Sequence, residues 1–537
     1  MGQLSGWPSE TVLRMRPLIL ACIAATYAIG GGWEPLGPFG GSAAIVQVDG
    51  QHPGTLLAAT GNAQIFRSED SGESWKALPF PGELRATLHA LAIDQRNPGV
   101  YLAGLSGDTP QYSGIMRTSD SGRTWKRIPV AGLTAIWSIA ICPQDSRVIA
   151  AGGENGLWLT RDGGESWEQT TPWNDSELTP IVALTFDPWD SKILYAGTPH
   201  LAWKTADGGN TWQSIHEGML DDSDIFSILV DDRRRRRVFA ATCGGIYRSL
   251  EGGAGWTKLI EATGASYRTY HIAQDPFQPN VLLAGTSQGL VKSVDSGNTW
   301  RTLSALSTRW IAFDPKQPNR IFVATDEAGL LRSDDGGESL QPINKGFSNR
   351  AFAALSAVAN DLYVTTLSAS GSLILRRSDS AAEWEELLNL GPEPIQAVPA
   401  PSDKLVNGLS LPVLDDLSVH DAVIAEGSDL LAATSRGLAR SHNAGVTWQL
   451  VAGTLDGSTV SALCRHPTRA GFLFASVFGK IFGSRDGGRS WTPLITGDEQ
   501  PGDLTALLVL PGNPDRLLAL SRSRGVYSMD LPAEWQN

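Results

Sequence analysis

The chain has 537 residues, of which 42% are hydrophobic, and its 58 glycines and 31 prolines recur at fixed places. This length accommodates several domains or one large repeat array with a buried core. The formal net charge of −13 excludes a general nucleic-acid-binding protein, because such a protein needs a basic surface to replace phosphate counterions.

Residues 1–28 are typical of a secretory signal peptide. Arg14 and Arg16 supply positive charge, an apolar core follows at 18–25, and 26–28 fits a small-residue cleavage site. The apolar core is far shorter than the ~20 residues that a spanning helix needs, so no stable membrane insertion is expected. We therefore expect a secreted or periplasmic protein.

The start codon and the cysteines bear on whether the protein has a lipid anchor, a disulfide framework or a metal site. Translation from Met15 instead of Met1 would leave a short signal, and Cys22 follows a poor match to a lipoprotein signal, which argues against a lipid anchor. The other cysteines form an odd set without metal-ligand spacing. No disulfide framework, metal site or cofactor is predicted from this set: Cys142, Cys243 and Cys464.

A Trp-ended motif recurs along the remaining residues, 29–537. With Trp33 included, most successive anchors lie 40 to 45 residues apart, close to the ~40–45 residues of a four-stranded propeller blade. Degenerate copies end at 256, 340, 384 and 535. The clear copies are SEDSGESW (68–75), TSDSGRTW (118–125), TRDGGESW (160–167), TADGGNTW (205–212), SVDSGNTW (293–300), SHNAGVTW (441–448) and SRDGGRSW (484–491).

Between the motifs lie short apolar runs and no segment long enough for a helix. One repeat contains IVALTFDP (181–188), ILYAGT (193–198) and LAWKT (201–205), separated by turn residues. This pattern predicts an all-β fold of four-stranded units. The glycines of the motif tolerate positive φ and its aspartate can accept loop amides, so these residues are predicted to be structural: Asp70, Trp75, Asp120, Trp125, Asp162, Trp167, Asp207, Trp212, Asp295, Trp300, Asp486 and Trp491.

The motif resembles the Asp-box, or BNR, repeat S-x-D-x-G-x-T/S-W. This repeat is known from sialidases, sortilin-type ten-bladed propellers, tandem-propeller xyloglucan endoglucanases and photosystem II assembly factors. The resemblance covers nearly the whole mature chain. It implies a β-propeller whose boxes are structural, so it identifies the fold and leaves the activity open.

The two ends of the array predict how it closes. Residues 33–36 resemble a fourth strand without its first three, and 504–527 resemble three strands without a fourth. Pairing them would remove two exposed edges and would give eleven blades. That number fits one large ring or two propellers, and the Pro-rich stretch 388–416 is the best candidate for a boundary or an insert.

The basic run 233–237 lies where other repeats carry a tight turn. We interpret it as a solvated turn, with a phosphate or polyanion contact as the alternative.

A ligand site is expected on the face opposite the boxes, where the loops before the first strand and between the second and third strands gather. Aromatic and basic residues at the start of the first strand should lie near the channel mouth. Strand packing is the alternative interpretation for them. These candidates are His89, Trp137, Phe226, Tyr270, Arg309 and His420, together with Trp173 in a loop.

Carboxylates in the loops of this face make a glycoside hydrolase the alternative function. The weak catalytic candidates are Asp222, Asp224, Asp498 and Glu499, although exposed rim charge also explains them. Such hydrolysis needs two carboxylates about 5–9.5 Å apart across one bond. The tandem-propeller endoglucanases have a catalytic aspartate in the first blade, whereas the matching stretch 58–62 contains no carboxylate.

These observations favour an exported, non-catalytic scaffold. It is expected to be a monomer that binds a cationic or neutral protein or a glycan, and no nucleic acid, through the face opposite the boxes.

Overall fold

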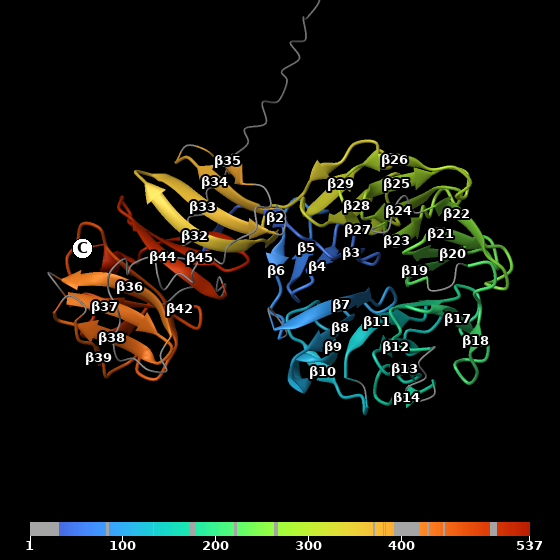
Figure 1. The fold of residues 1–537 in the computed structure, drawn as a ribbon, viewed down its shortest axis with the longest axis horizontal. Coiled ribbons are helices and arrows are strands. Elements are labelled where there is room, and N and C mark those ends of the chain that lie inside the picture. The colour runs from blue at the N-terminus through green and yellow to red at the C-terminus, as the bar shows by residue number, and fades with distance from the viewer. Residues whose placement is uncertain are drawn as a thin grey trace, which may run out of the picture.

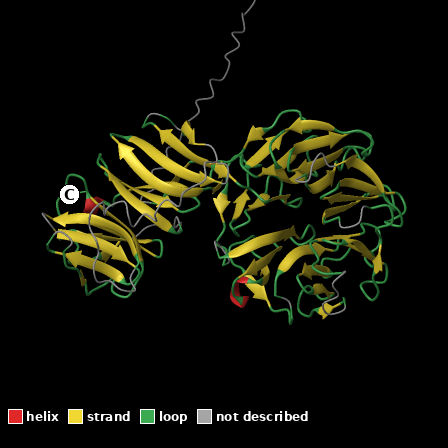
Figure 2. Ribbon diagram, viewed as in Figure 1, coloured by secondary structure: helices red, strands yellow, loops and turns green. Residues whose placement is uncertain are grey.

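The computed structural model describes residues 32–81, 85–132, 134–171, 178–219, 223–261, 267–368, 371–379, 381, 383–390, 418–426, 429–443, 446–494 and 502–536. Nearly all regular structure in these residues is β-strand, which confirms the all-β fold (Figure 2). The helices described are two short 3-10 turns, η1 (Pro110–Tyr112) and η3 (Ala533–Trp535). Among the described residues, no helix is long and apolar enough to cross a membrane.

Seven consecutive four-stranded antiparallel sheets form a ring, drawn from blue to yellow in Figure 1. Each blade contains four strands in chain order. They are β3 (Ile45–Val48), β4 (Leu56–Ala59), β5 (Ile65–Ser68), β6 (Lys76–Ala77); β7 (Ala86–Ile93), β8 (Tyr101–Gly107), β9 (Gly114–Thr118), β10 (Lys126–Ile128); β11 (Ile136–Ile141), β12 (Ile149–Gly153), β13 (Gly156–Thr160), β14 (Glu168–Gln169); β15 (Ala183–Phe186), β16 (Leu194–Thr198), β17 (Leu201–Thr205), β18 (Gln213–Ser214); β19 (Ile225–Val230), β20 (Val238–Thr242), β21 (Gly245–Ser249), β22 (Thr257–Glu261); β23 (Thr269–Gln274), β24 (Leu282–Thr286), β25 (Gly289–Ser293), β26 (Arg301–Ser304); β27 (Thr308–Phe313), β28 (Ile321–Thr325), β29 (Leu330–Ser333), β30 (Gln341–Pro342).

The ring closes by the same contact that joins its neighbouring blades. Inside the ring, Trp256 donates its indole N–H to the Ile215 carbonyl of the preceding blade. At the closure, the Trp75 indole donates to the Ile343 carbonyl over 2.6 Å, and the Trp75 amide donates to the Lys345 carbonyl. Strand β27 also packs against β3. The first blade therefore takes the last blade as its neighbour, so these seven blades form a closed propeller.

Four more four-stranded sheets form a second unit, the four-blade lobe. Its hydrophobic clusters join blade β32–β35 to the blade of β44–β46, that blade to β40–β43, and β40–β43 to β36–β39. The strands are β32 (Ala351–Val358), β33 (Asp361–Ser368), β34 (Gly371–Arg377), β35 (Glu385–Leu390); β36 (Val419–Glu426), β37 (Asp429–Thr434), β38 (Gly437–Ser441), β39 (Gln449–Leu450); β40 (Val460–Arg465), β41 (Leu473–Val477), β42 (Lys480–Ser484), β43 (Thr492–Pro493); β44 (Leu504–Leu510), β45 (Arg516–Ser521), β46 (Gly525–Asp530).

The N-terminal strand β1 (Glu34–Gly37) completes the last of these blades. It pairs antiparallel with β46, and the sheet order is β1-β46-β45-β44. The predicted pairing of the N-terminal strand with the last blade is therefore confirmed. Trp384 fixes the same strand by donating its indole N–H to the Leu36 carbonyl over 2.7 Å.

The ring is thus an insertion within the four-blade lobe. The chain leaves the lobe after β1, builds the ring, and returns. At this junction, where Figure 1 labels β2 between the two units, β2 (Gly40–Gly41) pairs in parallel with β31 (Ser348–Asn349). The two crossings therefore lie near residues 38–43 and 344–350. The stretch 388–416 is not one of them, and the alternative of an insert there stays a prediction. Most of the stretch 388–416 lies outside the described residues, between two blades of the lobe.

The Asp boxes form tight turns that are closed by their own hydrogen bonds. In the copy at 205–212, Asp207 accepts the Thr205 hydroxyl and the Thr211 amide on one oxygen and the Thr211 hydroxyl on the other. These hydrogen bonds stabilise the carboxylate and lower the pKa of Asp207 to about 2. The box glycines Gly208 and Gly209 have φ of +77° and +96°, which other residues rarely adopt.

The three described cysteines are unpaired thiols, Cys142, Cys243 and Cys464.

Candidate functional site

Six predicted ligand-binding residues share one structural position. Each is the extra residue of a β-bulge near the start of a blade's first strand, where the register of the strand pairing shifts. A bulge re-aims a side chain away from the regular alternation of the strand. All six side chains are half-buried, whereas the residue before each is buried in five of the six. They are His89, Trp137, Phe226, Tyr270, Arg309 and His420.

In the ring, five of these residues form two groups on neighbouring blades. His89 and Trp137 stack with ring centroids 4.8 Å apart and planes 14° apart. His89 Nε2 lies 2.7 Å from the hydroxyl of Ser106, which is the second-last residue of β8. Burial lowers the pKa of His89 below its usual value, so the imidazole is neutral near pH 7.

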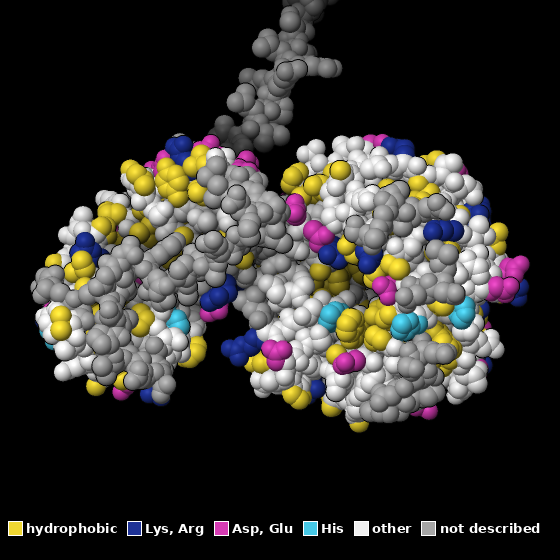
Figure 3. All heavy atoms as spheres, viewed as in Figure 1, with side chains coloured by type: hydrophobic (Ala, Val, Ile, Leu, Met, Phe, Trp, Pro, Cys, Tyr) yellow, Lys and Arg dark blue, Asp and Glu magenta, His cyan; other side chains and the backbone are white. Residues whose placement is uncertain are grey.

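The second group spans three successive blades. Phe226 and Tyr270 have ring centroids 6.1 Å apart, and the Arg309 guanidinium lies 4.1 Å from the centre of the Tyr270 ring. Asp326, in the loop after β28, accepts Arg309 Nε over 2.7 Å and the Ser307 hydroxyl over 2.6 Å. We call these two groups the aromatic collar. Figure 3 shows hydrophobic, histidine and basic (Lys or Arg) side chains around the middle of the ring.

His420 lies apart from the collar, and this corrects the prediction of one set of six residues. It belongs to β36 of the four-blade lobe. The matching bulge residues of the other three lobe blades are small, namely Ala353, Ser461 and Thr505. Burial, together with the positive charge of Arg522, lowers the pKa of His420. The lobe therefore has no aromatic equivalent of the collar at these positions.

The remaining candidates are only partly described. Trp173, Asp222, Asp498 and Glu499 lie outside the described residues. Asp224 is half-buried just before β19, and its carbonyl accepts the Cys243 amide on the same loop face. Among the described residues, no group of histidine, cysteine and carboxylate side chains could hold a metal ion.

The loop that would carry a catalytic aspartate in the tandem-propeller endoglucanases holds neutral side chains here. Thr60 donates its hydroxyl to Asn62 over 2.5 Å in the loop between β4 and β5. Asn62 donates to Asn349 over 3.0 Å, and Gln64 donates to the Ser523 hydroxyl over 2.9 Å. These contacts join the ring to the four-blade lobe, so this loop serves the junction.

Four residues around the collar were not predicted from the sequence: His271, Trp310, Asp326 and Ser106. His271 stacks on Trp310 with centroids 4.0 Å apart and planes 21° apart, one residue beyond the bulges of their strands. Asp326, in the loop after β28, and Ser106, near the end of β8, bind collar residues. Comparing the ends of the second strands between repeats could have found both residues, because they share the face of the collar. The stacking depends on neighbouring blades and has no sequence signal.

Burial lowers the pKa of His271 to about 3, against a usual value of 6.5. Since the unfolded chain therefore binds the proton first, the free energy of unfolding should fall as the pH drops from 6.5 towards 3. We expect a loss on the order of a few kcal/mol over that window. A His271→Phe variant keeps the ring stack but cannot titrate, so denaturant titrations should show a weaker pH dependence between pH 6.5 and 4. The box carboxylates titrate lower, as the pKa of about 2 for Asp207 indicates. Equal pH slopes for the variant and the parent protein would contradict the assignment.

Comparisons with known proteins agree on the fold. A family model described as Sortilin, neurotensin receptor 3 matches residues 113–229. The GH74 enzyme of Niastella koreensis is 15% identical, with a TM-score of 0.66 over 93% of this chain and 99% of its own. The GH74 xyloglucanase from Xanthomonas campestris is 17% identical, with a TM-score of 0.55 over 93% of this chain and 88% of its own. Comparison with curated proteins gives no match. At these identities the similarity establishes an Asp-box β-propeller fold alone.

Proposed function

We propose that this protein is an exported, non-catalytic scaffold that binds a protein or glycan ligand through the loop face of the seven-bladed ring. The aromatic collar carries the proposal. It brings residues from five of the seven blades to one end of the channel, on the face opposite the boxes. A monomer in the secreted or periplasmic space fits the predicted signal peptide at 1–28.

The chemistry of the collar suits a ligand with flat apolar faces. Stacked aromatic rings contact the faces of sugars or the side chains of a peptide, and the Arg309–Asp326 pair provides polar contacts beside them. Their side chains are 41% and 28% exposed, so a ligand can reach both. The neutral imidazole of His89 adds no positive charge near pH 7, which agrees with a neutral or cationic ligand.

Removing a collar ring should weaken binding. We expect Trp137→Ala and Tyr270→Ala each to reduce ligand affinity by about tenfold or more, because aromatic anchors near the centre of an interface contribute about 2 kcal/mol or more. The measurement is a glycan array in parallel with capture from an envelope extract, followed by titration of the ligand found. Trp189→Ala is the matched control, since Trp189 is 45% exposed in a turn of the box face. Equal losses in all three variants, or no ligand in either assay, would refute the proposal.

A glycoside hydrolase is the second candidate, favoured by the fold similarity to two GH74 proteins across 93% of this chain. Its carboxylates would come from the loops before the first strands. The purified protein should be incubated with xyloglucan, β-glucans and sialosides, beside Asp222→Asn, Asp224→Asn and Asp498→Asn variants. Turnover by the parent protein that is lost in any of these variants would show that the protein is a glycoside hydrolase and would refute the non-catalytic proposal.

A further inference from the structure

The arginine run 233–237 forms the turn between β19 and β20, on the box face of the ring. The solvated turn predicted from sequence is wrong for Arg237, whose side chain is 4% exposed and forms an ion pair with Asp231, which is fully buried. Arg237 also donates to the Ser296 hydroxyl and the Pro279 carbonyl of the next blade. It therefore joins two blades and holds the turn in place.

Two adjoining hollows flank this turn, with volumes of about 550 and 530 Å³. They share Arg234 and Asn280. Asp295 is the single carboxylate among the described residues that line them, and its oxygens already accept Ser293 and Thr299 within the box. Five arginines line the hollows: Arg233, Arg234, Arg235, Arg237 and Arg248.

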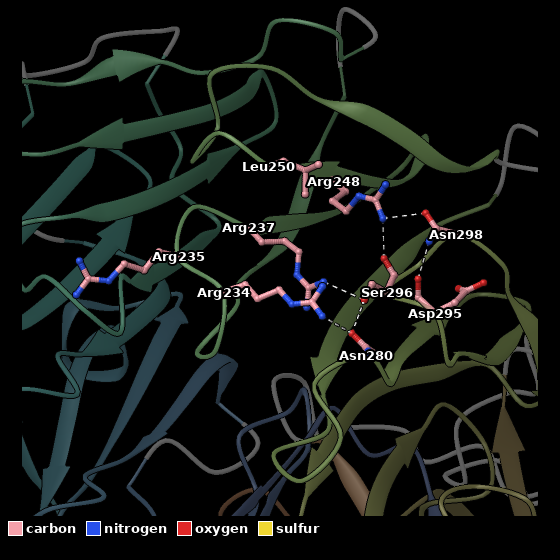
Figure 4. Close-up of a pocket in the computed structure, with 9 residues that line it drawn as sticks. All are labelled: Arg234, Arg235, Arg237, Arg248, Leu250, Asn280, Asp295, Ser296 and Asn298. Atoms are coloured by element: carbon pink, nitrogen blue, oxygen red, sulfur yellow. Dashed lines mark hydrogen bonds between the residues drawn. The ribbon is translucent and has the colours of Figure 1, made fainter.

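The arginine side chains differ in how many of their hydrogen-bond donors are used within the protein. In Figure 4, Arg234, Arg237 and Arg248 converge near Ser296, whereas Arg235 points away. Arg235 instead lies 5.0 Å from the centre of the Trp189 ring in the preceding blade. The Arg234 guanidinium donates one described hydrogen bond, to Asn280 Oδ1 over 3.0 Å. A guanidinium has five N–H donors, so Arg234 retains capacity for a ligand.

Arg248 has a repeated structural role but lacks the acidic partner that two equivalent cations of the ring have. A basic side chain at the same position of the third strand donates to the carbonyl of the fourth box residue in the next blade. Arg117 donates to Gly163 in this way, and Arg248 donates to Ser296. In two other blades the sixth box residue is a glutamate that pairs with this cation, Glu338 with Lys292 and Glu73 with Arg332. Here that residue is Asn298, a neutral acceptor, at 3.0 Å from Arg248. Arg248 Nε is buried and has no partner among the described residues.

These contacts leave unbalanced positive charge in a protein with a net charge of −13. Like charges held together repel one another, and the charges of Arg234 and Arg248 add to the burial that lowers the pKa of Arg237. An oxyanion would relieve this repulsion, and arginine binds phosphate and sulfate oxygens with paired hydrogen bonds. We propose that the two hollows bind a ligand with phosphate or sulfate groups, contacted by Arg234 and Arg248. The adjoining hollows accommodate two such groups along one molecule.

Calorimetric titration at low salt with inorganic phosphate, inorganic sulfate, tripolyphosphate and a sulfated heparin tetrasaccharide tests the site. We expect the two multivalent probes to bind more tightly than the single ions, and added salt to weaken all four. Tighter binding of tripolyphosphate would indicate a phosphate-bearing natural ligand, and tighter binding of the tetrasaccharide a sulfated one. Arg234→Gln and Arg248→Gln should each weaken binding by about tenfold, the effect of losing a charge-assisted hydrogen bond.

Two matched controls separate the site from general attraction to arginine. Arg117→Gln removes the same third-strand cation in another blade, and Arg96→Gln removes a turn arginine that donates to the Pro143 carbonyl, as Arg233 donates to Pro276. Both should bind the probes like the parent protein. Absence of binding, or equal losses in the controls and the site variants, would overturn the proposal. The site lies on the box face, so collar variants such as Tyr270→Ala should leave it unchanged.

Discussion

Replacing Trp75 by alanine should open the seven-bladed ring between its first and last blades. Trp75 is 4% exposed and packs with Phe66, Ile343 and Phe347 in the cluster that joins these blades. Its centroid lies 6.5 Å from that of Phe347. A Trp→Ala change in such a core removes about 3–5 kcal/mol. The loss should concentrate at the closure, because β3 and β27 are held together by packing and share no sheet.

Hydrogen exchange read by mass spectrometry localises the effect. We expect faster exchange in peptides from β3–β6 and β27–β30, and a lower denaturant midpoint for the ring. Peptides from β40–β46 should exchange as in the parent protein. Uniform acceleration across both units would contradict a ring that closes independently of the lobe.

Replacing Trp33 by alanine should produce the reciprocal result in the four-blade lobe. Trp33 is 4% exposed, precedes β1 and packs in the cluster that joins blades β40–β43 and β44–β46. The expected loss is again about 3–5 kcal/mol. Weaker docking of β1 would also expose the edge of β46, and an unpaired strand edge favours aggregation.

The same exchange measurement tests this variant. Peptides from β40–β46 should lose protection while those from β11–β22 keep it. Light scattering should detect aggregation at lower denaturant concentrations than for Trp75→Ala. Intact protection in β44–β46 would show that β1 contributes little to its blade.

The repeat explains why much of the fold could be predicted. Each box needs glycines at positive φ, an acceptor for loop amides and a large apolar anchor, and these requirements leave a local pattern in sequence. The described residues contain eleven four-stranded sheets, the number of units expected from the repeats. The unpaired fourth strand near Trp33 and the missing fourth strand near 527 together predicted β1 pairing with β46.

The candidate site was predicted in part. Aligning the starts of the first strands placed His89, Trp137 and Tyr270 on one face, because bulges recur at the same point of each repeat. The same alignment added His420, which the structure places in the other unit. Asp326 was missed because it acts through contact with Arg309, and such pairing depends on how neighbouring blades meet.

The sequence by itself determined the strand content, the positions of the box turns and the partner of the N-terminal strand, since each depends on residues within one repeat or on an unpaired edge. Only the tertiary structure decided that seven blades close into a ring inserted within a four-blade lobe. It also decided that the collar divides into two groups, of which His89 and Trp137 are stacked, and that Arg237 is buried while Arg234 and Arg248 line a hollow. These features depend on how neighbouring blades pack, which the residues within one repeat do not determine.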